Sequence, residues 1–296
     1  MNVAVMIPCY NERETIAGVV GDFRRQLPQA RIVVFDNGST DDSASLAGDA
    51  GAEVIAVLRR GKGFLMQRMF ELVRADVYVL VDGDGTYDAA GVHELLRLVE
   101  QGTADMAVGR RQPLTPAAMK PMNKLGNFFF SRLMSMYFNV KLDDILSGFR
   151  VVNREFGEQI PILSFEFEVE AEITLQALSR EMRIKEVPVG YRPRPAGSKS
   201  KLRVFKDGYM VLSTVVALFR DLRPLTFFGL IAAALWLGAL TYGIHVYAAE
   251  RLAGLFDVIV LTSVFIIGWL FLLIGFALHT INRRFAEMVS VLRRMR

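Results

Sequence analysis

Two carboxylates separated by one glycine, Asp82 and Asp84, follow the β-branched and aromatic run Val77–Val81. Alternate residues of an extended chain lie on one face, so both side chains can reach a hard cation such as Mg²⁺ or Mn²⁺, which prefers oxygen ligands. Gly83 and Gly85 carry no side chain, which leaves room for a large ligand against the backbone. We therefore expect a metal-binding loop, with an ordinary Asp-Gly turn that closes a strand as the alternative.

Polar residues also follow two other strand-like runs, in the segments Ile7–Glu12 and Phe35–Asp42. Asp36 is suited to accept hydrogen bonds from the base or ribose of a nucleotide. The triplet Gly61–Gly63, which opens a helical pattern, can place a lysine and free amides near a phosphate. The alternatives are a plain helix N-cap at Ser39–Asp42 and a basic turn without function.

These motifs lie within an alternation of strand and helix patterns over residues 1–110. β-rich apolar runs predict strands at Val3–Ile7, Ile32–Phe35, Val54–Val57, Val77–Val81 and Met106–Val108. Helical patterns predict helices at Glu12–Leu27, Asp41–Ala50, Phe64–Arg74 and Ala89–Glu100. The alternation predicts an α/β fold, a Rossmann-like and mostly parallel sheet with helices on both faces. The polar motifs then meet at the carboxyl edge of the sheet, where such folds bind ligands.

The chain has 296 residues, of which 52% are apolar, and the apolar excess lies near the C-terminus. Residues 225–247 and 258–280 form two runs without Asp, Glu, Lys or Arg. Each is long enough to cross a hydrocarbon core about 30 Å thick. A hairpin buried in a soluble core is the alternative, but core helices are rarely apolar all round for that length. We expect a transmembrane hairpin within residues 224–296, followed by a basic tail.

The distribution of arginines predicts the orientation of this hairpin. The connection Ala248–Asp257 has only Arg251 as a base, whereas several arginines lie outside the two runs. These are Arg220, Arg223, Arg283, Arg284, Arg293, Arg294 and Arg296. The positive-inside rule therefore places both termini and the N-terminal domain in the cytoplasm. The net charge of +4 fits an anionic leaflet better than a nucleic acid, because the bases cluster near the spans.

Two other segments have apolar residues at helical spacing beside basic ones, Lys124–Phe138 and Leu202–Leu222. We expect interfacial helices in the headgroup plane, with packing on the sheet as the alternative. The expected domains are a cytoplasmic catalytic domain over 1–200, a juxtamembrane amphipathic helix over 201–223, and the hairpin with its tail over 224–296. The run Asn2–Ile7 is strand-like, so no signal peptide is expected, and the single cysteine, Cys9, excludes an intrachain disulfide.

The motifs, in their order and spacing, resemble family 2 glycosyltransferases of the GT-A fold. The segments that carry this resemblance are Ile-Pro-Cys-Tyr-Asn-Glu at 7–12, Asp-Asn-Gly-Ser-Thr-Asp at 36–41, Gly-Lys-Gly at 61–63 and Asp-Gly-Asp-Gly-Thr-Tyr at 82–87. The segments Leu146–Arg150, Phe167–Glu170 and Gly197–Leu202, with the two-span anchor, narrow it to polyprenyl-phosphate glycosyltransferases, relatives of dolichyl-phosphate mannose synthase. The resemblance covers essentially the whole chain.

The resemblance implies transfer of a hexose from UDP-hexose or GDP-mannose to a polyprenyl phosphate, with inversion at the anomeric carbon. It implies Mg²⁺ or Mn²⁺ held by Asp82 and Asp84, with Asp84 also catalytic. The implied contacts of the nucleotide sugar are Pro8, Tyr10, Glu12, Asp36, Lys62, Asp82 and Gly83. In archaeal mannose synthases the metal motif continues to a glutamine, and here that position is Thr86, a weaker ligand.

The acceptor phosphate is already anionic, so it needs cations that position it more than it needs a general base. The residues implied for this role are, in order, Arg110, Lys124, Arg150, Arg194, Ser198 and Lys201. Arg110, Lys124 and Glu168 are the implied catalytic residues besides Asp84. Ordinary solvated or headgroup-contacting side chains are the alternative for the bases. Glu168, Glu170 and Glu172 could each assist the donor sugar, with ion pairs on a helix face as the alternative. The segment Gly197–Lys201 is expected to close over the donor.

Two other functions stay open at this point. A processive polysaccharide synthase typically carries a Gln-x-x-Arg-Trp motif and more spans, whereas both tryptophans here, Trp236 and Trp269, lie in the expected spans. A catalytically silent membrane adaptor with the same fold is the second alternative. The expected partners are a nucleotide sugar, a polyprenyl phosphate and the lipid bilayer, without nucleic acid. A homo-oligomer is compatible with the sequence. The sequence determines neither the sugar nor the length of the acceptor.

Overall fold

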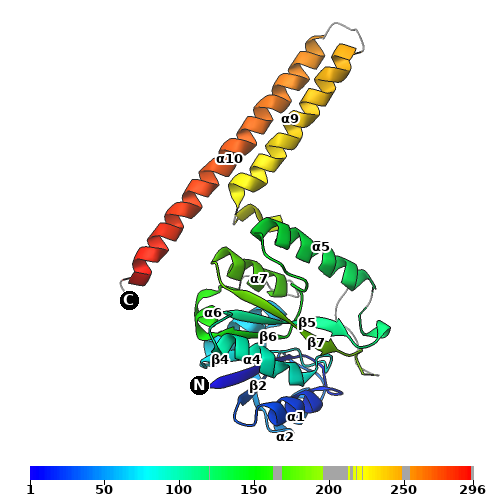
Figure 1. The fold of residues 1–296 in the computed structure, drawn as a ribbon, viewed down its shortest axis with the longest axis vertical. Coiled ribbons are helices and arrows are strands. Elements are labelled where there is room, and N and C mark those ends of the chain that lie inside the picture. The colour runs from blue at the N-terminus through cyan, green and yellow to red at the C-terminus, as the bar shows by residue number, and fades with distance from the viewer. Residues whose placement is uncertain are drawn as a thin grey trace. The chain divides into compact units, whose positions relative to one another are not determined.

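The structure is a computed structural model and describes residues 1–119, 121–162, 169–195, 213, 216–217, 219–221, 223–248 and 254–294. Within it, the chain divides into two compact units, residues 1–214 and residues 215–296. The first unit is an α/β domain and the second consists of the C-terminal helices (Figure 1).

The first unit is built on a seven-stranded sheet with the strand order β3-β2-β1-β4-β6-β5-β7. The strands are β1 Val3–Cys9, β2 Arg31–Asp36, β3 Glu53–Ala56, β4 Val77–Leu80, β5 Met106–Pro113, β6 Arg150–Asn153 and β7 Ile184–Tyr191. β6 runs antiparallel to β4 and β5, and the other neighbours are parallel. The predicted mostly parallel α/β sheet is thus confirmed, whereas the four-residue strand β6 gave no recognisable pattern in the sequence.

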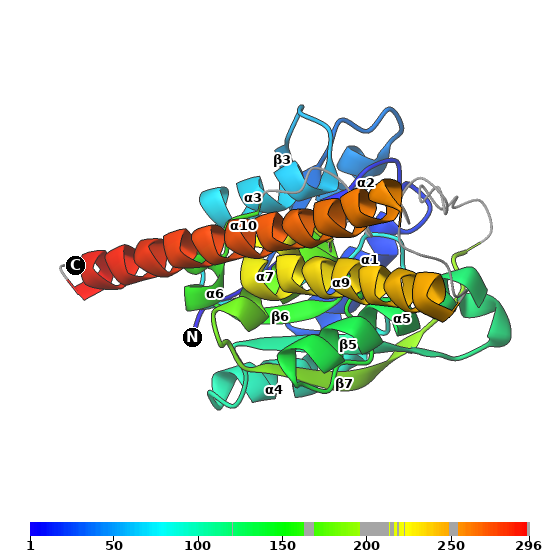
Figure 2. The same ribbon diagram turned by 90° about the horizontal axis from the view of Figure 1, so that it is seen from above.

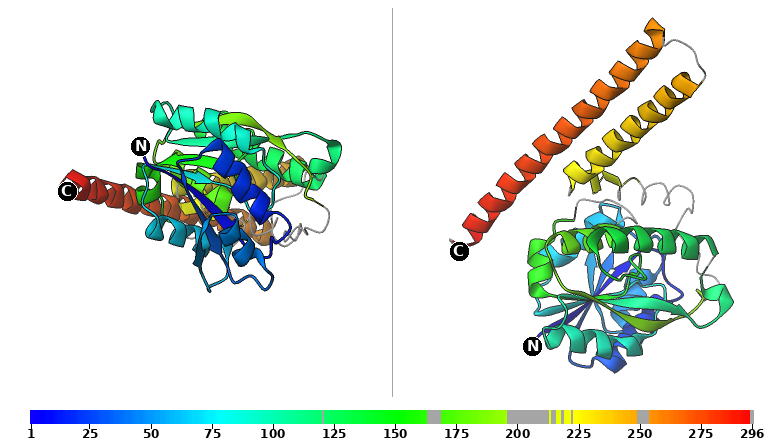
Figure 3. Two further views of the ribbon diagram at one scale, coloured as in Figure 1. Left: turned by 90° about the horizontal axis from the view of Figure 1, so that it is seen from below. Right: turned by 45° about the horizontal axis from the view of Figure 1, so that its top comes forward.

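Helices cover both faces of the sheet, as predicted. α1 Ile16–Gln26, α2 Ser43–Asp49 and α4 Val92–Glu100 pack on one face, and α3 Lys62–Leu72, α6 Arg154–Gln159 and α7 Val169–Ser179 pack on the other. Strand β1 contributes apolar side chains to both faces of the sheet, because successive side chains of a strand point to opposite faces. Val5 and Ile7 pack with α1, α2 and α4, and Ala4 and Met6 pack with α3, α6 and α7. The view from below in Figure 3 shows α1, in blue, and α4, in teal, in front of the sheet.

A helix that covers the sheet, such as α4, has apolar residues at helical spacing, which give it one apolar face. α4 buries Val92, Leu95, Leu96 and Val99, which recur at intervals of three and four residues. Before α4, the Asp88 carboxylate accepts from the amide of Ala90 and caps the 3₁₀ turn η1 Ala89–Gly91, which begins where helix was predicted. A second 3₁₀ turn, η2, covers Pro116–Ala118.

Helix α5, Pro121–Phe138, contains the first predicted amphipathic segment. Phe130 and Met134 are buried on it, whereas Phe128 is 67% exposed. The Asn127 side chain donates to the carbonyl of Asp143 at 2.8 Å, which ties the helix to the loop before β6. One face of α5 therefore packs on the domain. The second predicted amphipathic segment, Leu202–Leu222, lies largely outside the described residues.

The second unit contains two long apolar helices, α9 Pro224–Ala248 and α10 Leu255–Arg294, which lie side by side (Figures 1 and 2). Both are long and apolar enough to cross a membrane, and only 6% and 11% of their most apolar 18-residue windows are buried. This low burial argues against the soluble-core alternative. The Trp236 indole N–H donates to the carbonyl of Phe265 at 3.2 Å, and Gly268 gives the indole its space.

Candidate active site

The two carboxylates of the metal motif lie in the loop that leaves β4 at the carboxyl edge of the sheet. The Thr15 hydroxyl donates to the carbonyl of Gly83 at 2.7 Å and fixes the loop to the start of α1. Gly85 has a φ of +70°, which permits the turn that follows Asp84. The predicted motif is therefore held on both sides by its local structure.

Asp84 is 4% exposed and each of its oxygens has a partner. The amide and the hydroxyl of Thr86 donate to Oδ1 at 3.1 and 2.6 Å. Oδ2 lies 2.6 Å from Nη2 of Arg194, whose Nη1 lies 3.7 Å from a carboxylate oxygen of Glu12. Thr86 therefore orients Asp84, and Arg194, from the segment after β7, forms an ion pair with its carboxylate.

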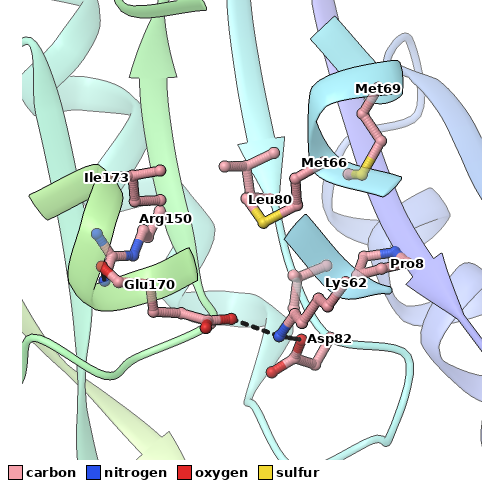
Figure 4. A pocket seen from close by; sticks show the side chains of 11 residues that line it. Pro8, Lys62, Met66, Met69, Leu80, Asp82, Arg150, Glu170 and Ile173 are labelled. Carbon is pink, nitrogen blue, oxygen red and sulfur yellow. Dashed lines mark hydrogen bonds and ion pairs between the residues drawn. The ribbon is translucent and has the colours of Figure 1, made fainter. Parts of the chain in front are cut away.

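Asp82 is paired with a different cation. Nζ of Lys62, the first residue of α3, lies 2.6 Å from Asp82 Oδ1 and 2.5 Å from Oε1 of Glu170 in α7 (Figure 4). Burial by itself raises the pKa of the Asp82 carboxyl, but the ammonium of Lys62 outweighs it and holds the pKa below its usual range. Burial would likewise lower the pKa of Lys62, and the charges of Asp82 and Glu170 raise it instead. Lys62 and Asp82 are therefore both charged at neutral pH.

The back of Asp82 is formed by the segment before β6. A Cβ on Gly148 would lie 2.8 Å from Cγ of Asp82, so only glycine leaves room for the carboxylate. The amide of Gly148 donates to the Tyr87 hydroxyl at 2.8 Å, and the Ser147 hydroxyl donates to the carbonyl of Gly109 at 2.6 Å. Burial raises the pKa of Tyr87, so the phenol stays neutral in this network.

Arg150 is placed differently from the prediction that it contacts the acceptor phosphate. Its side chain is 1% exposed, and all five of its N–H groups have acceptors. The acceptors are the carbonyl oxygens of Ile145, Ser147 and Glu170, the hydroxyl of Thr174 and the sulfur of Met106. Because no donor is left for a phosphate, the prediction for Arg150 is wrong, and its role is to join α7 to the segment before β6.

Gly83 has a packing reason to be glycine, apart from the predicted contact with a ligand. A Cβ at this position would meet Cδ1 of Ile16 at 3.2 Å and the carbonyl oxygen of Pro8 at 3.3 Å. Side-chain bulk is therefore excluded at Gly83 by α1 and β1, and a contact of its backbone with the nucleotide sugar stays a prediction.

The predicted nucleotide residues meet at the ends of β1 and β2, where Cys9 pairs with Asp36. The Asp36 carboxylate accepts from the amide of Ser39 at 3.2 Å and is 8% exposed. The Arg60 guanidinium lies 4.9 Å from the ring centroid of Tyr10. Asn37 supports this edge: its amide donates to the carbonyls of Val57 and Arg59, and its oxygen accepts from the amide of Gly61, directly before Lys62.

The candidates for the acceptor phosphate are more dispersed. Arg110 in β5 is 42% exposed and lies 3.5 Å from a carboxylate oxygen of Asp143, and Lys124 in α5 is exposed. Arg194 lies at the carboxylates of Glu12 and Asp84, on the metal side of the site. Ser198, Lys201 and Glu168 lie outside the described residues, as does the segment Gly197–Lys201.

The carboxylates of Asp82 and Asp84 suit a hard divalent cation. Each is paired with a cationic side chain, Asp82 with Lys62 and Asp84 with Arg194, so a divalent cation would compete with these bases for the carboxylate oxygens. Across the described parts of the chain, no group of three or more His, Cys, Asp or Glu side chains could hold a metal ion together. A cation here would therefore take its remaining ligands from water and from a bound diphosphate.

Gly148 is a site residue that sequence reasoning did not assign, and Glu170 was considered only as one of three glutamates that could assist the donor sugar or form ion pairs on a helix face. Glu170 is 6% exposed in a helix whose neighbours Val169 and Ala171 are fully buried. An acidic residue within an apolar helical run is a signal that favours a buried partner. For Gly148 no signal in the sequence gives the reason, because the clash it avoids involves a residue 66 positions earlier.

Comparisons with known proteins agree with this geometry. Residues 4–159 match the family described as Glycosyl transferase family 2. The chain is 33% identical over 233 residues to Glycosyltransferase AglJ of Haloferax volcanii, covering 78% of this chain and 77% of that protein. It is 29% identical over 215 residues to Dolichyl-phosphate hexose transferase of the same organism, covering 73% of this chain and 92% of that protein.

Among solved structures, glucosyl-3-phosphoglycerate synthase from Mycobacterium tuberculosis, in complex with Mn²⁺, UDP and glucosyl-3-phosphoglycerate, is similar with a TM-score of 0.61. The identity is 19%, and the match covers 73% of this chain and 79% of that one, which shows the fold alone. The expected GT-A-like architecture is confirmed. Since the family match spans more than half of the sequence, this chain belongs to glycosyl transferase family 2.

Proposed function

We propose that this protein transfers a hexose from a nucleotide diphosphate sugar, UDP-hexose or GDP-mannose, to a polyprenyl phosphate, with inversion at the anomeric carbon. The observation that carries the proposal is the pairing of Asp82 and Asp84 with Lys62 and Arg194, at the carboxyl edge of the sheet, in a chain with two long apolar helices. The similarity to a protein named dolichyl-phosphate hexose transferase supports the acceptor class.

The donor lies along the ends of β1, β2 and β4 in this proposal. Asp36 and Tyr10 hold the nucleoside, and Pro8 and Glu12 complete that part of the site. Asp82 and Asp84 bind Mg²⁺ or Mn²⁺, which neutralises the departing diphosphate when bound. Lys62 and Arg194 lie beside the same two carboxylates, and we assign both to the diphosphate, because each is held there as a cation.

The acceptor phosphate approaches from the other side of the anomeric carbon. Its oxygen is already anionic, so the protein need only orient it and offset repulsion from the diphosphate. Arg110, half-exposed within β5, is the first residue for this task, and Lys124 on α5 is the second. Ser198 and Lys201 remain in the proposal on the resemblance alone, and so does Glu168 as a residue that assists the donor sugar.

The orientation of the protein in the membrane is proposed from the distribution of its arginines. We propose that α9 and α10 span the bilayer, with the catalytic domain and both termini in the cytoplasm, because arginines cluster outside the spans and the connecting segment has only one. The orientation is tested with cysteines placed in the 248–257 connection and labelled in intact cells with a membrane-impermeant maleimide. Labelling there, with none at a cysteine near residue 285, is the expected result, and the reverse pattern contradicts the orientation.

The activity is tested by incubating the detergent-solubilised protein with UDP-hexoses or GDP-mannose and with undecaprenyl or dolichyl phosphate. Each combination is run with Mn²⁺, Mg²⁺ or EDTA, and lipid-linked sugar is detected by mass spectrometry. A product of one hexose per lipid phosphate is expected. A polymer would indicate a processive synthase, and the absence of both nucleotide binding and product would indicate a silent adaptor.

A further inference from the structure

Glu170 is a buried carboxylate that the proposed reaction does not yet use. It lies in the first turn of α7 and is 6% exposed. Its Oε1 lies 2.5 Å from Nζ of Lys62, and the same ammonium lies 2.6 Å from Oδ1 of Asp82. Figure 4 shows Lys62 between the two acids, which come from α7 and from the loop after β4.

Glu170 is held firmly in this position. Nη2 of the buried Arg150 donates to its backbone carbonyl at 3.0 Å, and Nη1 donates to the hydroxyl of Thr174, one turn later in α7. The first turn of a helix also favours a negative charge. Arg150 therefore fixes the first turn of α7, which carries the Glu170 side chain, to the sheet.

The three side chains of Lys62, Asp82 and Glu170 carry a net charge of −1, because one ammonium is shared by two carboxylates. A divalent cation that binds Asp82 competes with Lys62 for that carboxylate and repels the ammonium. A buried lysine with Asp82 as its sole partner would then lose its counter-charge, which opposes metal binding. With Glu170 present, Lys62 keeps a partner when Asp82 turns to the metal.

We propose that Glu170 is a positioning residue that retains Lys62 beside the metal site when a divalent cation takes Asp82, so that the ammonium is available to the donor diphosphate. This inference rests on the proposed function, since it assumes a metal and a nucleotide diphosphate at the site. It makes Lys62 a permanent part of the site in both states, with Asp82 as its exchangeable partner and Glu170 as its constant one.

The test measures binding and does not depend on transfer activity. Mn²⁺ binding to the full-length protein is followed by electron paramagnetic resonance in the presence of UDP or GDP, and nucleotide binding by calorimetry. Glu170→Gln keeps the size of the side chain and removes its charge. We expect the dissociation constant of the nucleotide in the presence of Mn²⁺ to rise about tenfold, which is typical of a lost charge-assisted hydrogen bond.

A double-mutant cycle with Lys62→Met separates positioning from direct contact. If Glu170 acts through Lys62, the tenfold effect of Glu170→Gln disappears in the Lys62→Met background. An undiminished effect in that background would mean that Glu170 acts on the sugar or the metal itself, and it overturns the proposal. Equal affinities of wild type and Glu170→Gln overturn it as well.

Glu172→Gln is the matched control, because Glu172 is a second glutamate of α7, is 1% exposed and accepts from the side chain of Gln176 at 2.9 Å. We expect its nucleotide affinity to equal that of the wild type. If Glu170→Gln does not fold, Glu170→Asp gives the same test, with an expected rise of about twofold to threefold that again disappears with Lys62→Met. Failure of the wild type to bind either nucleotide with Mn²⁺ would instead contradict the proposed function.

Discussion

Gly148 lies against the carboxylate of Asp82, so that a Cβ at residue 148 would be 2.8 Å from Asp82 Cγ. The two residues come from the segment before β6 and the loop after β4, which meet because β4 and β6 are neighbours in the sheet. The metal motif is therefore shaped by a residue far away in the sequence. The same segment is joined to Tyr87 through the amide of Gly148.

We expect Gly148→Ala to displace Asp82 and to weaken Mn²⁺ binding by at least about tenfold, because a ligand shift of even 1 Å has effects of this order or larger. The measurement is Mn²⁺ titration by electron paramagnetic resonance in the presence of nucleotide. Gly18→Ala is the control, since Gly18 lies in α1 and a methyl group added there would meet no atom within 4 Å. Unchanged Mn²⁺ affinity in Gly148→Ala would show that Asp82 does not bind the metal.

Replacement of either carboxylate of the motif should abolish transfer without unfolding the protein. In Asp82→Asn and Asp84→Asn, the loss of a charged ligand is expected to lower the transfer rate by about a hundredfold or more, as removal of charge-stabilising groups does in other enzymes. Activity is measured with the donor and acceptor that give product in the screening assay described above, and folding by the melting temperature. Asp88→Asn, in the same loop region but capping η1, is expected to keep its activity. Normal turnover in Asp82→Asn and Asp84→Asn would contradict the proposal that these two carboxylates bind the metal ion.

Arg110 and Arg111 are neighbours in β5 with different environments. Arg111 Nε and Nη2 donate to Asp144 at 2.8 and 2.6 Å, and this pair is nearly buried, whereas Arg110 is 42% exposed. We expect Arg110→Gln to raise the KM for polyprenyl phosphate severalfold at an unchanged melting temperature. Arg111→Gln should instead cost about 3–5 kcal/mol of stability, because it removes the guanidinium that faces the buried Asp144 and leaves the backbone amide of residue 111 as a neutral donor.

Steady-state kinetics with varied acceptor, together with thermal unfolding, distinguish the two arginines. If Arg110→Gln changes the melting temperature and leaves the KM for the acceptor as in the wild type, Arg110 is a structural residue and the acceptor phosphate binds elsewhere.

Asp105 makes the stability of the α/β domain depend on pH in the acid range. Hydrogen bonds from the Arg183 side chain outweigh burial and lower the pKa of Asp105 in the folded protein. Because its folded pKa is below the unfolded one, the stabilisation is complete above the unfolded value of about 3.9 and is lost as the pH falls through the folded value.

The comparison that checks this is the melting temperature of the wild type minus that of Asp105→Asn, in detergent. At pH 7 we expect a difference of about 2–4 °C, which corresponds to about 1 kcal/mol in a protein of this size. Near pH 3 the difference should shrink, because Asp105 is then increasingly protonated. A difference that is equal at both pH values would contradict the assignment.

The hairpin can be monitored by intrinsic fluorescence, since its Trp236 and Trp269 are the only tryptophans of the chain. Their ring centroids are 5.5 Å apart, and a Cβ on Gly268 would lie 2.9 Å from Cδ1 of Trp236. We expect Gly268→Ala to separate the helices locally and to shift the tryptophan emission. Gly238→Ala, where nothing lies within 4 Å, should leave the spectrum unchanged. An identical spectrum for Gly268→Ala would mean that α9 and α10 do not pack through this position.

The sequence by itself determined the strand–helix alternation, the place of Asp82 and Asp84 directly after a buried strand, and the two apolar helices. These features depend on local periodicity and composition, since a strand repeats every two residues, a helix every three to four, and a span needs about 20 apolar residues. The helix boundaries were less well determined: the helix predicted from Glu12 begins at Ile16, because residues 12–15 form a turn whose amides at Thr15 and Ile16 share the carbonyl of Glu12.

Tertiary structure alone decided which cation meets which carboxylate. Lys62 lies between Asp82 and Glu170 because α3 and α7 pack on the same face of the sheet, and no local pattern relates residues so far apart in the chain. Arg150 was expected to contact the acceptor phosphate on the resemblance of the segment Leu146–Arg150 alone. Its burial follows from the position of β6 inside the sheet, between β4 and β5, where a guanidinium must satisfy every donor with protein atoms.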